Sequence, residues 1–231
     1  MPEVDVVVGA HAWIDTDRNI LKEYRCYNGI SSAHHLLAEY LMRPVQGGGF
    51  LWRRGPLLAA GAWDEHLPIC QDADLAIRML LRLGSFRIAA LGEAHAVWRA
   101  HGGARITTSM STAKLEAVLG VLMAHAPALR AMENDAINAG LADRFYRLSR
   151  LAFALANDRV GDEALRQARA FGLAGHPGTF GHRVASQVLG LKLKTRLTAS
   201  YYRRISKVPV GERPYPYNLH LFTDLRLSHS T

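Results

Sequence analysis

The spacing of apolar residues changes near residue 112, and this change constrains the fold more than any other feature. Before it, short runs of β-branched and aromatic residues alternate with loops that contain glycine or proline, and a few stretches have helical spacing. After it, apolar residues recur only at intervals of three and four. The sequence therefore predicts an α/β region over 1–111 and an all-α region over 112–231. A chain of 231 residues can bury one large core or two small ones.

The first region has predicted strands at 4–9, 50–52, 86–91 and 96–101, and predicted helices at 32–42, 56–60 and 72–83. The stretch 10–30 is interpreted as irregular, with a turn at 15–17. In the second region the helices centre on 115–122, 145–155, 164–171 and 184–205. Pro127, Gly161 and the segment 175–178 are expected to separate them, and 209–231 to run over the surface.

The net charge of +8 comes from the second region alone. Residues 1–111 hold 11 Lys/Arg and 11 Asp/Glu, whereas residues 112–231 hold 17 and 9. The segment 183–207 contains seven basic residues and no acidic one, interleaved with apolar residues. This pattern fits a helix that binds an anionic membrane surface, or a solvated helix face packed on the rest of the chain. A nucleic-acid-binding role is disfavoured because few aromatic residues are placed for base stacking.

Several features of the sequence limit where in the cell the protein is expected. No stretch approaches the roughly 20 apolar residues of a membrane-spanning helix, and the N-terminus lacks the pattern of a secretory signal. Two cysteines cannot build a disulfide framework, and neither belongs to a CxxC metal motif. We expect a cytoplasmic protein, peripheral at the inner face of a membrane if 183–207 binds there.

The densest chemical signal is the segment 67–75, which delivers Asp72 and Asp74 to the start of a helix. Carboxylates are favoured there because the first N–H groups and the helix dipole attract negative charge. Asp72 could simply be an N-cap residue, and Asp74 a first-turn residue paired with Arg78 four positions later. A carboxylate at this position that faces a cleft can also accept a proton.

Two further groups of residues could bind ligands. Arg99 and His101 share one face of a predicted strand end and could meet a phosphate or a metal. They could equally be a surface arginine and a hydrogen-bonded histidine. Trp63 and Asp64 combine an aromatic ring with a carboxylate, which suits a sugar, although Trp63 could instead anchor the core.

Taken in order, several passages resemble the family 2 glycosyltransferases, which have the GT-A fold. The passages 50–54, 60–68 and 71–78 resemble that family's "F-R-R…G-G-F-D-E…L-P…E-D-x-D-L-x-x-R", and 98–107 resembles its "Y-R-x-H…S-I-T". The resemblance covers about residues 3 to 108. It implies a partial GT-A-type mixed sheet with helices, which forms the acceptor-side half of such a domain.

The resemblance also implies a reaction: inverting transfer of a sugar from a nucleotide-sugar to a hydroxyl of a glycan or lipid-linked acceptor, as in cell-surface polysaccharide synthesis. Asp72 would be the general base. The other implied roles are acceptor binding by Trp63, Asp64, Gln71 and Asp74, donor diphosphate binding by Arg99 and His101, and metal binding by His101. The cofactor would be Mn²⁺ or Mg²⁺, with most of its ligands outside this chain.

The sequence departs from the family in two ways. Gln71 replaces the glutamate of the acidic pair, which puts the acceptor role of that position in doubt. The nucleotide-binding half that should precede Val4 is expected to be missing, and the Asp-Thr-Asp at 15–17 is interpreted as a turn. A non-catalytic remnant that binds glycan or a protein partner is therefore the alternative function. An exposed sheet edge would favour a homo-oligomer.

Overall fold

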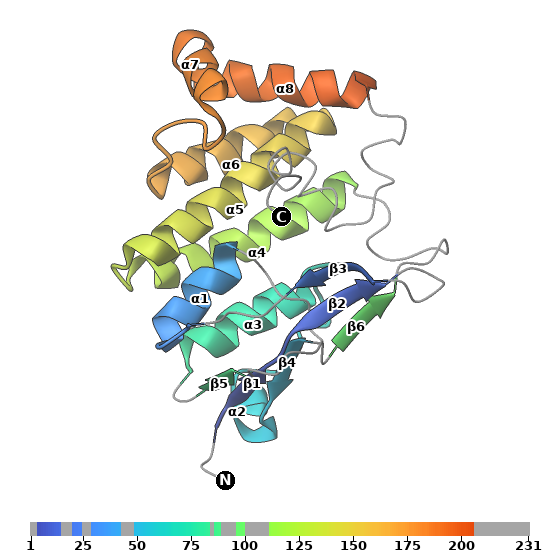
Figure 1. The fold of residues 1–231 in the computed structure, drawn as a ribbon, viewed down its shortest axis with the longest axis vertical. Coiled ribbons are helices and arrows are strands. Elements are labelled where there is room, and N and C mark those ends of the chain that lie inside the picture. The colour runs from blue at the N-terminus through green and yellow to red at the C-terminus, as the bar shows by residue number, and fades with distance from the viewer. Residues whose placement is uncertain are drawn as a thin grey trace. The chain divides into compact units, whose positions relative to one another are not determined.

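The computed structural model describes residues 4–14, 20–24, 29–42, 49–83, 86–88, 96–99 and 111–205 (Figure 1). The chain forms two compact units. The first unit consists of Met1–Gly103 with His125–Gly140, and the second unit of Ala104–Ala124 with Leu141–Thr231. This division differs from the change in secondary structure near residue 112, because part of the helical region joins the first unit. The fold is α/β and mostly helical.

Two three-stranded sheets carry the described strands of the first unit. In one sheet, β1 (Val6–Val8) lies between β4 (Phe50–Trp52), antiparallel to it, and β5 (Phe86–Ile88), parallel to it. In the other sheet, β2 (His11–Ile14) lies between β3 (Ile20–Tyr24), antiparallel, and β6 (Ala96–Arg99), parallel. The expectation that 10–30 is irregular was therefore wrong, since β2 and β3 pair within it.

The core of the first unit forms around β1 and helix α1 (Ala33–Met42). Val6 and Val8 are buried, as expected for β-branched residues on a central strand. Tyr40 of α1 meets Phe50 of β4 edge to face, with ring centroids 5.6 Å apart. Helix α1 also packs against α3 (Gln71–Leu81), which buries Leu75, Ala76, Ile77, Met79 and Leu80. The predicted helix at 32–42 and the strand at 50–52 are confirmed.

Helices α2 (Arg54–Ala59) and α3 begin earlier than the sequence predicted. Pro56 lies inside the first turn of α2 rather than at its start. The N-cap of α3 is Cys70, whose φ of 68° is left-handed, so Asp72 is a first-turn residue and not the N-cap. The position affects where the side chain lies, because an N-cap side chain turns back onto the helix, whereas a first-turn side chain can face solvent.

The remaining helices are α4 (Thr112–Arg130), α5 (Asp135–Ala154), α6 (Asp158–Ala170), α7 (Phe180–Leu189) and α8 (Leu191–Ile205). Pro127 and Gly161 lie inside α4 and α6, so neither separates helices as predicted. Gly190, with a φ of 75°, divides the single helix predicted at 184–205 into α7 and α8. The break predicted at 175–178 is confirmed, since this segment joins α6 to α7.

The second unit is built on close helix contacts. Phe145 of α5 stacks on Phe171 with ring centroids 6.0 Å apart, and Asn157 caps α6 by accepting a hydrogen bond from the Val160 N–H at 3.1 Å. Gly161 is required for packing: a Cβ there would lie 2.5 Å from the Phe153 ring. Among the residues that the structure describes, no helix is both long and apolar enough to cross a bilayer.

Candidate functional site

Asp72 presents an exposed carboxylate at the start of α3. Its Oδ1 accepts a hydrogen bond from the Trp63 indole Nε1–H at 3.0 Å. The Trp63 ring is itself 46% exposed, so Trp63 is not the core anchor that one interpretation of the sequence allowed. The arrangement places an ionisable oxygen beside an accessible aromatic face, and the N-terminal end of α3 favours negative charge there.

The turn that carries Trp63 has an unusual backbone. Gly61 and Ala62 both adopt positive φ, at 87° and 50°. A left-handed conformation costs a non-glycine residue such as Ala62 about 1 kcal/mol or more, so neighbouring contacts must hold it. Arg78 of α3 supplies them: its guanidinium donates to the carbonyl oxygen of Ala62 at 2.6 Å and to that of Ala60. Arg78 therefore fixes the turn that aims Trp63 at Asp72.

Asp74 in turn fixes Arg78. Its Oδ2 accepts hydrogen bonds from Arg78 Nε at 2.8 Å and Nη2 at 2.6 Å, which confirms the pair predicted at i,i+4. Its Oδ1 lies 2.8 Å from Nε2 of His125 on α4. Successive helix residues are about 100° apart, so Asp72 and Asp74 lie about 200° apart around α3 and face different sides. With both oxygens engaged and 13% side-chain exposure, Asp74 acts as a positioning residue here.

Gln71 and Asp64, both predicted to bind the acceptor, hold loops in this structure. The Gln71 amide donates to the Leu67 carbonyl oxygen at 2.6 Å, just before α3. Asp64 Oδ1 accepts from the His66 backbone N–H at 2.9 Å, which makes a tight turn after Trp63. Asp64 is exposed and directly follows Trp63 in the sequence, whereas Gln71 is half-buried. Both bonds stabilise the segment that connects Trp63 to Asp72.

The predicted donor-side residues lie mostly outside the described part of the chain. Arg99 ends β6, where its backbone pairs with Ile14, and its side chain is not described. His101 and the segment 15–17 lie outside the described residues. Within the described ranges no three His, Cys, Asp or Glu side chains gather to hold a metal ion. The described site does not fit a divalent metal, because Asp72 is a single carboxylate and both oxygens of Asp74 are already engaged by Arg78 and His125.

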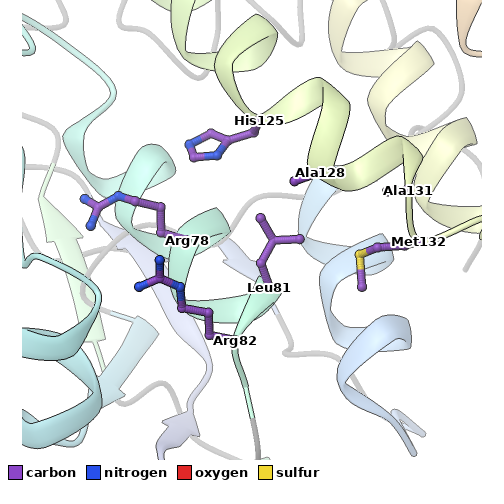
Figure 2. Close-up of a pocket in the computed structure, with 7 residues that line it drawn as sticks. All are labelled: Arg78, Leu81, Arg82, His125, Ala128, Ala131 and Met132. Carbon is purple, nitrogen blue, oxygen red and sulfur yellow. The ribbon is translucent and has the colours of Figure 1, made fainter.

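An open pocket of about 540 Å³ lies beside Arg78 and His125, the two residues that contact Asp74 (Figure 2). It is lined by Arg78 and Leu81 of α3, by Arg82 just after α3, and by His125, Ala128, Ala131 and Met132 from α4 and the turn after it. Neither Asp72 nor Trp63 lines it, so the pocket and the exposed carboxylate are separate features. We place the candidate chemistry at Asp72, because its carboxylate is exposed and bonded only from one side among described residues.

The sequence did not indicate the roles of Arg78 and His125. Arg78 was expected only to pair with Asp74, and His125 lies 51 residues after Asp74 in a region interpreted as separate. The available signal was weak: a histidine on a mostly apolar helix, which more often marks a satisfied core residue than a site. No family model, curated protein or solved structure matches the chain.

Proposed function

We propose that this chain is a glycosyltransferase that moves a sugar from a nucleotide-sugar to a hydroxyl acceptor with inversion, and that Asp72 is its general base. The observation that carries the proposal is the exposed Asp72 carboxylate held at 3.0 Å by the exposed Trp63 indole. The resemblance of residues 50–78 to family 2 glycosyltransferases adds to it.

The chemistry follows from the position of the carboxylate. An acceptor hydroxyl becomes nucleophilic as it loses its proton, and a carboxylate within hydrogen-bond reach can take that proton in the transition state. Asp72 keeps one oxygen free of the Trp63 bond for this purpose. The hydrogen bond from Trp63 restrains the carboxylate, so that less orientational freedom is lost when the acceptor binds.

Trp63 supplies the acceptor surface. Sugars present flat faces of C–H groups that stack on aromatic rings, and Trp63 exposes its ring next to Asp72. A sugar stacked on this ring places a hydroxyl near the carboxylate. The chain of contacts from His125 through Asp74 and Arg78 to the 60–63 turn keeps the ring in place.

The donor and its metal involve residues beyond the described part of the chain. Arg99 and His101 remain our candidates for the diphosphate, and His101 for Mn²⁺ or Mg²⁺. The described residues do not form the site of this metal.

The test is a calorimetric titration of the protein with UDP and UDP-sugars, with and without Mn²⁺, followed by transfer assays with glycan acceptors. Metal-dependent nucleotide binding and product formation are expected. A second titration follows Trp63 fluorescence with glycans, with Trp63→Phe as the reference. Glycan binding without nucleotide binding would assign the non-catalytic glycan-binding alternative, and binding of neither would contradict both.

A membrane partner has its own supporting observation, on α7 and α8. Each helix leaves one apolar stripe exposed at intervals of four: Phe180, Val184 and Val188 on α7, and Leu193, Leu197 and Tyr201 on α8. Some of the basic side chains expected to face a membrane are instead engaged within the second unit. Lys192 pairs with Asp162 at 2.8 Å, Arg196 pairs with Asp158, and Lys194 is buried. We therefore propose that apolar contact, more than charge, would bring α7 and α8 to an anionic membrane.

Flotation with vesicles of anionic and of neutral lipids tests this partner. The double variant Phe180→Ser/Val188→Ser should lose most of the floated fraction, since it removes the two most exposed apolar side chains of α7. Leu58→Ser, which changes an exposed leucine on α2, is the matched control and should float like the original protein. Equal flotation of all three would leave the α7–α8 surface without a membrane role.

A further inference from the structure

The second unit buries a cluster of basic side chains that the proposed reaction does not use. Lys194 of α8 is 4% exposed, and its Nζ has no hydrogen-bond partner among the described residues. Arg150 of α5 and His176 of the 175–178 segment are also buried. His182 of α7 stacks on His176 with ring centroids 5.0 Å apart and is only half-buried. Four cationic or potentially cationic groups thus gather, and His182 is the least buried of them.

Among the described residues, no carboxylate shifts the pKa of Lys194, on which only burial and the charge of Arg150 act. Asp143 of α5 interacts electrostatically with Arg150 and forms an ion pair with Arg147 at 2.6 Å. A buried ammonium without a partner is costly, because its hydration is lost and nothing replaces it. Such groups are few in native proteins, and a bound ion that supplies the missing partner is one explanation for them.

His176 can also donate a hydrogen bond within this cluster. His176 Nδ1 accepts from the Gly178 N–H at 2.8 Å, so a neutral His176 ring carries its proton on Nε2 and can donate from there. Gly178 is needed for this contact, since a Cβ would lie 2.7 Å from the His176 ring. The Lys194 ammonium and the Arg150 guanidinium act on the His176 ring electrostatically, so all three donor groups belong to one cluster.

We propose that Lys194, Arg150, His176 and His182 form a binding site for a phosphoryl group. Phosphate oxygens are strong acceptors, and a dianion matches several converging cationic donors. The phosphoryl group enters on the His182 side. It comes either from a soluble phosphate compound or from a phosphomonoester lipid headgroup, which fits the exposed apolar stripes of the same two helices. The site lies within the second unit and does not depend on Asp72.

The electrostatics of the cluster agree with this assignment. Burial, followed by the positive charges of Lys194, Arg150 and His182, lowers the pKa of His176 to about 3. Burial and Arg150 lower the pKa of Lys194 to about 8. A bound anion would raise both pKa values, because it favours the protonated forms.

The test compares melting temperatures in phosphate and in chloride at equal ionic strength. The original protein should gain a few degrees, with saturation as phosphate increases. Lys194→Met should lose this gain, whereas Lys192→Met, an exposed lysine two positions away, should keep it. His182→Ala should weaken phosphate binding several-fold, and provides a second variant should Lys194→Met not fold.

Vesicles distinguish the two sources. Phosphatidic acid and phosphatidylglycerol vesicles of matched charge are compared by flotation, for the original protein and for Lys194→Met. A preference for phosphatidic acid that depends on Lys194 assigns a lipid headgroup, and a melting-temperature gain without that preference assigns a soluble phosphate. No gain and no preference, or equal responses in Lys194→Met and the original protein, would overturn the site.

Discussion

The two units treat a cationic side chain in opposite ways. In the first unit, Arg78 meets the Asp74 carboxylate and two carbonyl oxygens, and Asp74 also meets His125. In the second unit, the Lys194 ammonium is buried with no hydrogen-bond partner among the described residues. A fully paired network serves to hold its neighbours in position, whereas an unpaired charge is a cost that a ligand can remove. We therefore interpret the paired network around Arg78 as support for the Asp72 surface, and the buried Lys194 as part of the proposed binding site.

The largest expected effect on stability comes from breaking the paired network. Asp74→Ala leaves Arg78 and His125 without their carboxylate, and should lower the free energy of unfolding by about 3 kcal/mol. Urea denaturation measures the change. Asp72→Ala, two positions away and exposed, is the matched control and should change stability by about 0.5 kcal/mol or less. A similar loss in both variants would remove the distinction between the two aspartates.

Lys194→Met should have the opposite effect on stability. Replacing an unpaired buried ammonium with an apolar side chain should raise the free energy of unfolding at pH 7 by about 2 kcal/mol in phosphate-free buffer. The same variant loses phosphate binding, so stability and ligand binding should separate. Destabilisation by this change would mean that Lys194 has a partner of structural value.

The pH dependence of the second unit follows from the same residue. Folded Lys194 loses its proton above a pKa of about 8, whereas the unfolded chain holds it until about 10.5. The unfolded state therefore binds more protons between these values, and stability should rise with pH across this window. Lys194→Met should lack this rise. Thermal unfolding at several pH values between 8 and 10.5 compares the two proteins.

Substitutions at two glycines should have the smallest effects on stability, and they test the packing of the helices. Gly161→Ala places a Cβ 2.5 Å from the Phe153 ring and should cost about 1 to 2 kcal/mol. Gly120→Ala, inside α4 and with no atom near the new Cβ, should stabilise by about 0.5 to 1 kcal/mol. Thermal unfolding measures both, and equal signs would contradict the packing described around Phe153.

Local signals in the sequence predicted several elements well. Helix α1, strand β4 and the Asp74–Arg78 pair follow from spacing within one element. The hairpin of β2 and β3 was missed because Lys22 and Glu23 interrupt the apolar pattern of β3. Its strands are defined by pairing with each other, and β2 also pairs with β6, where His11 faces Ala96, 85 residues later in the sequence.

The remaining errors have a common physical origin. The backbone preferences of Gly161 and Pro127 predicted helix ends at these residues, but tertiary packing keeps both inside helices. Phe153 fills the space above Gly161, and Leu129 is buried beyond Pro127. Conversely Gly190 does break a helix, through its left-handed φ. Of the candidate site, the sequence proposed Asp72 and Trp63, and their functional roles stay predictions. Their hydrogen bond and the support from His125 depend on contacts between distant segments.

The rate of sugar transfer by Asp72→Asn tests the central claim most directly. Once a donor and acceptor are found, this variant should lose about 10²-fold or more in kcat while its unfolding curve stays unchanged, because the amide cannot accept the acceptor's proton. Glu65→Gln, an exposed carboxylate outside the site, should keep full activity. Turnover by Asp72→Asn at the rate of the original protein would contradict the account, since another group would then remove the proton.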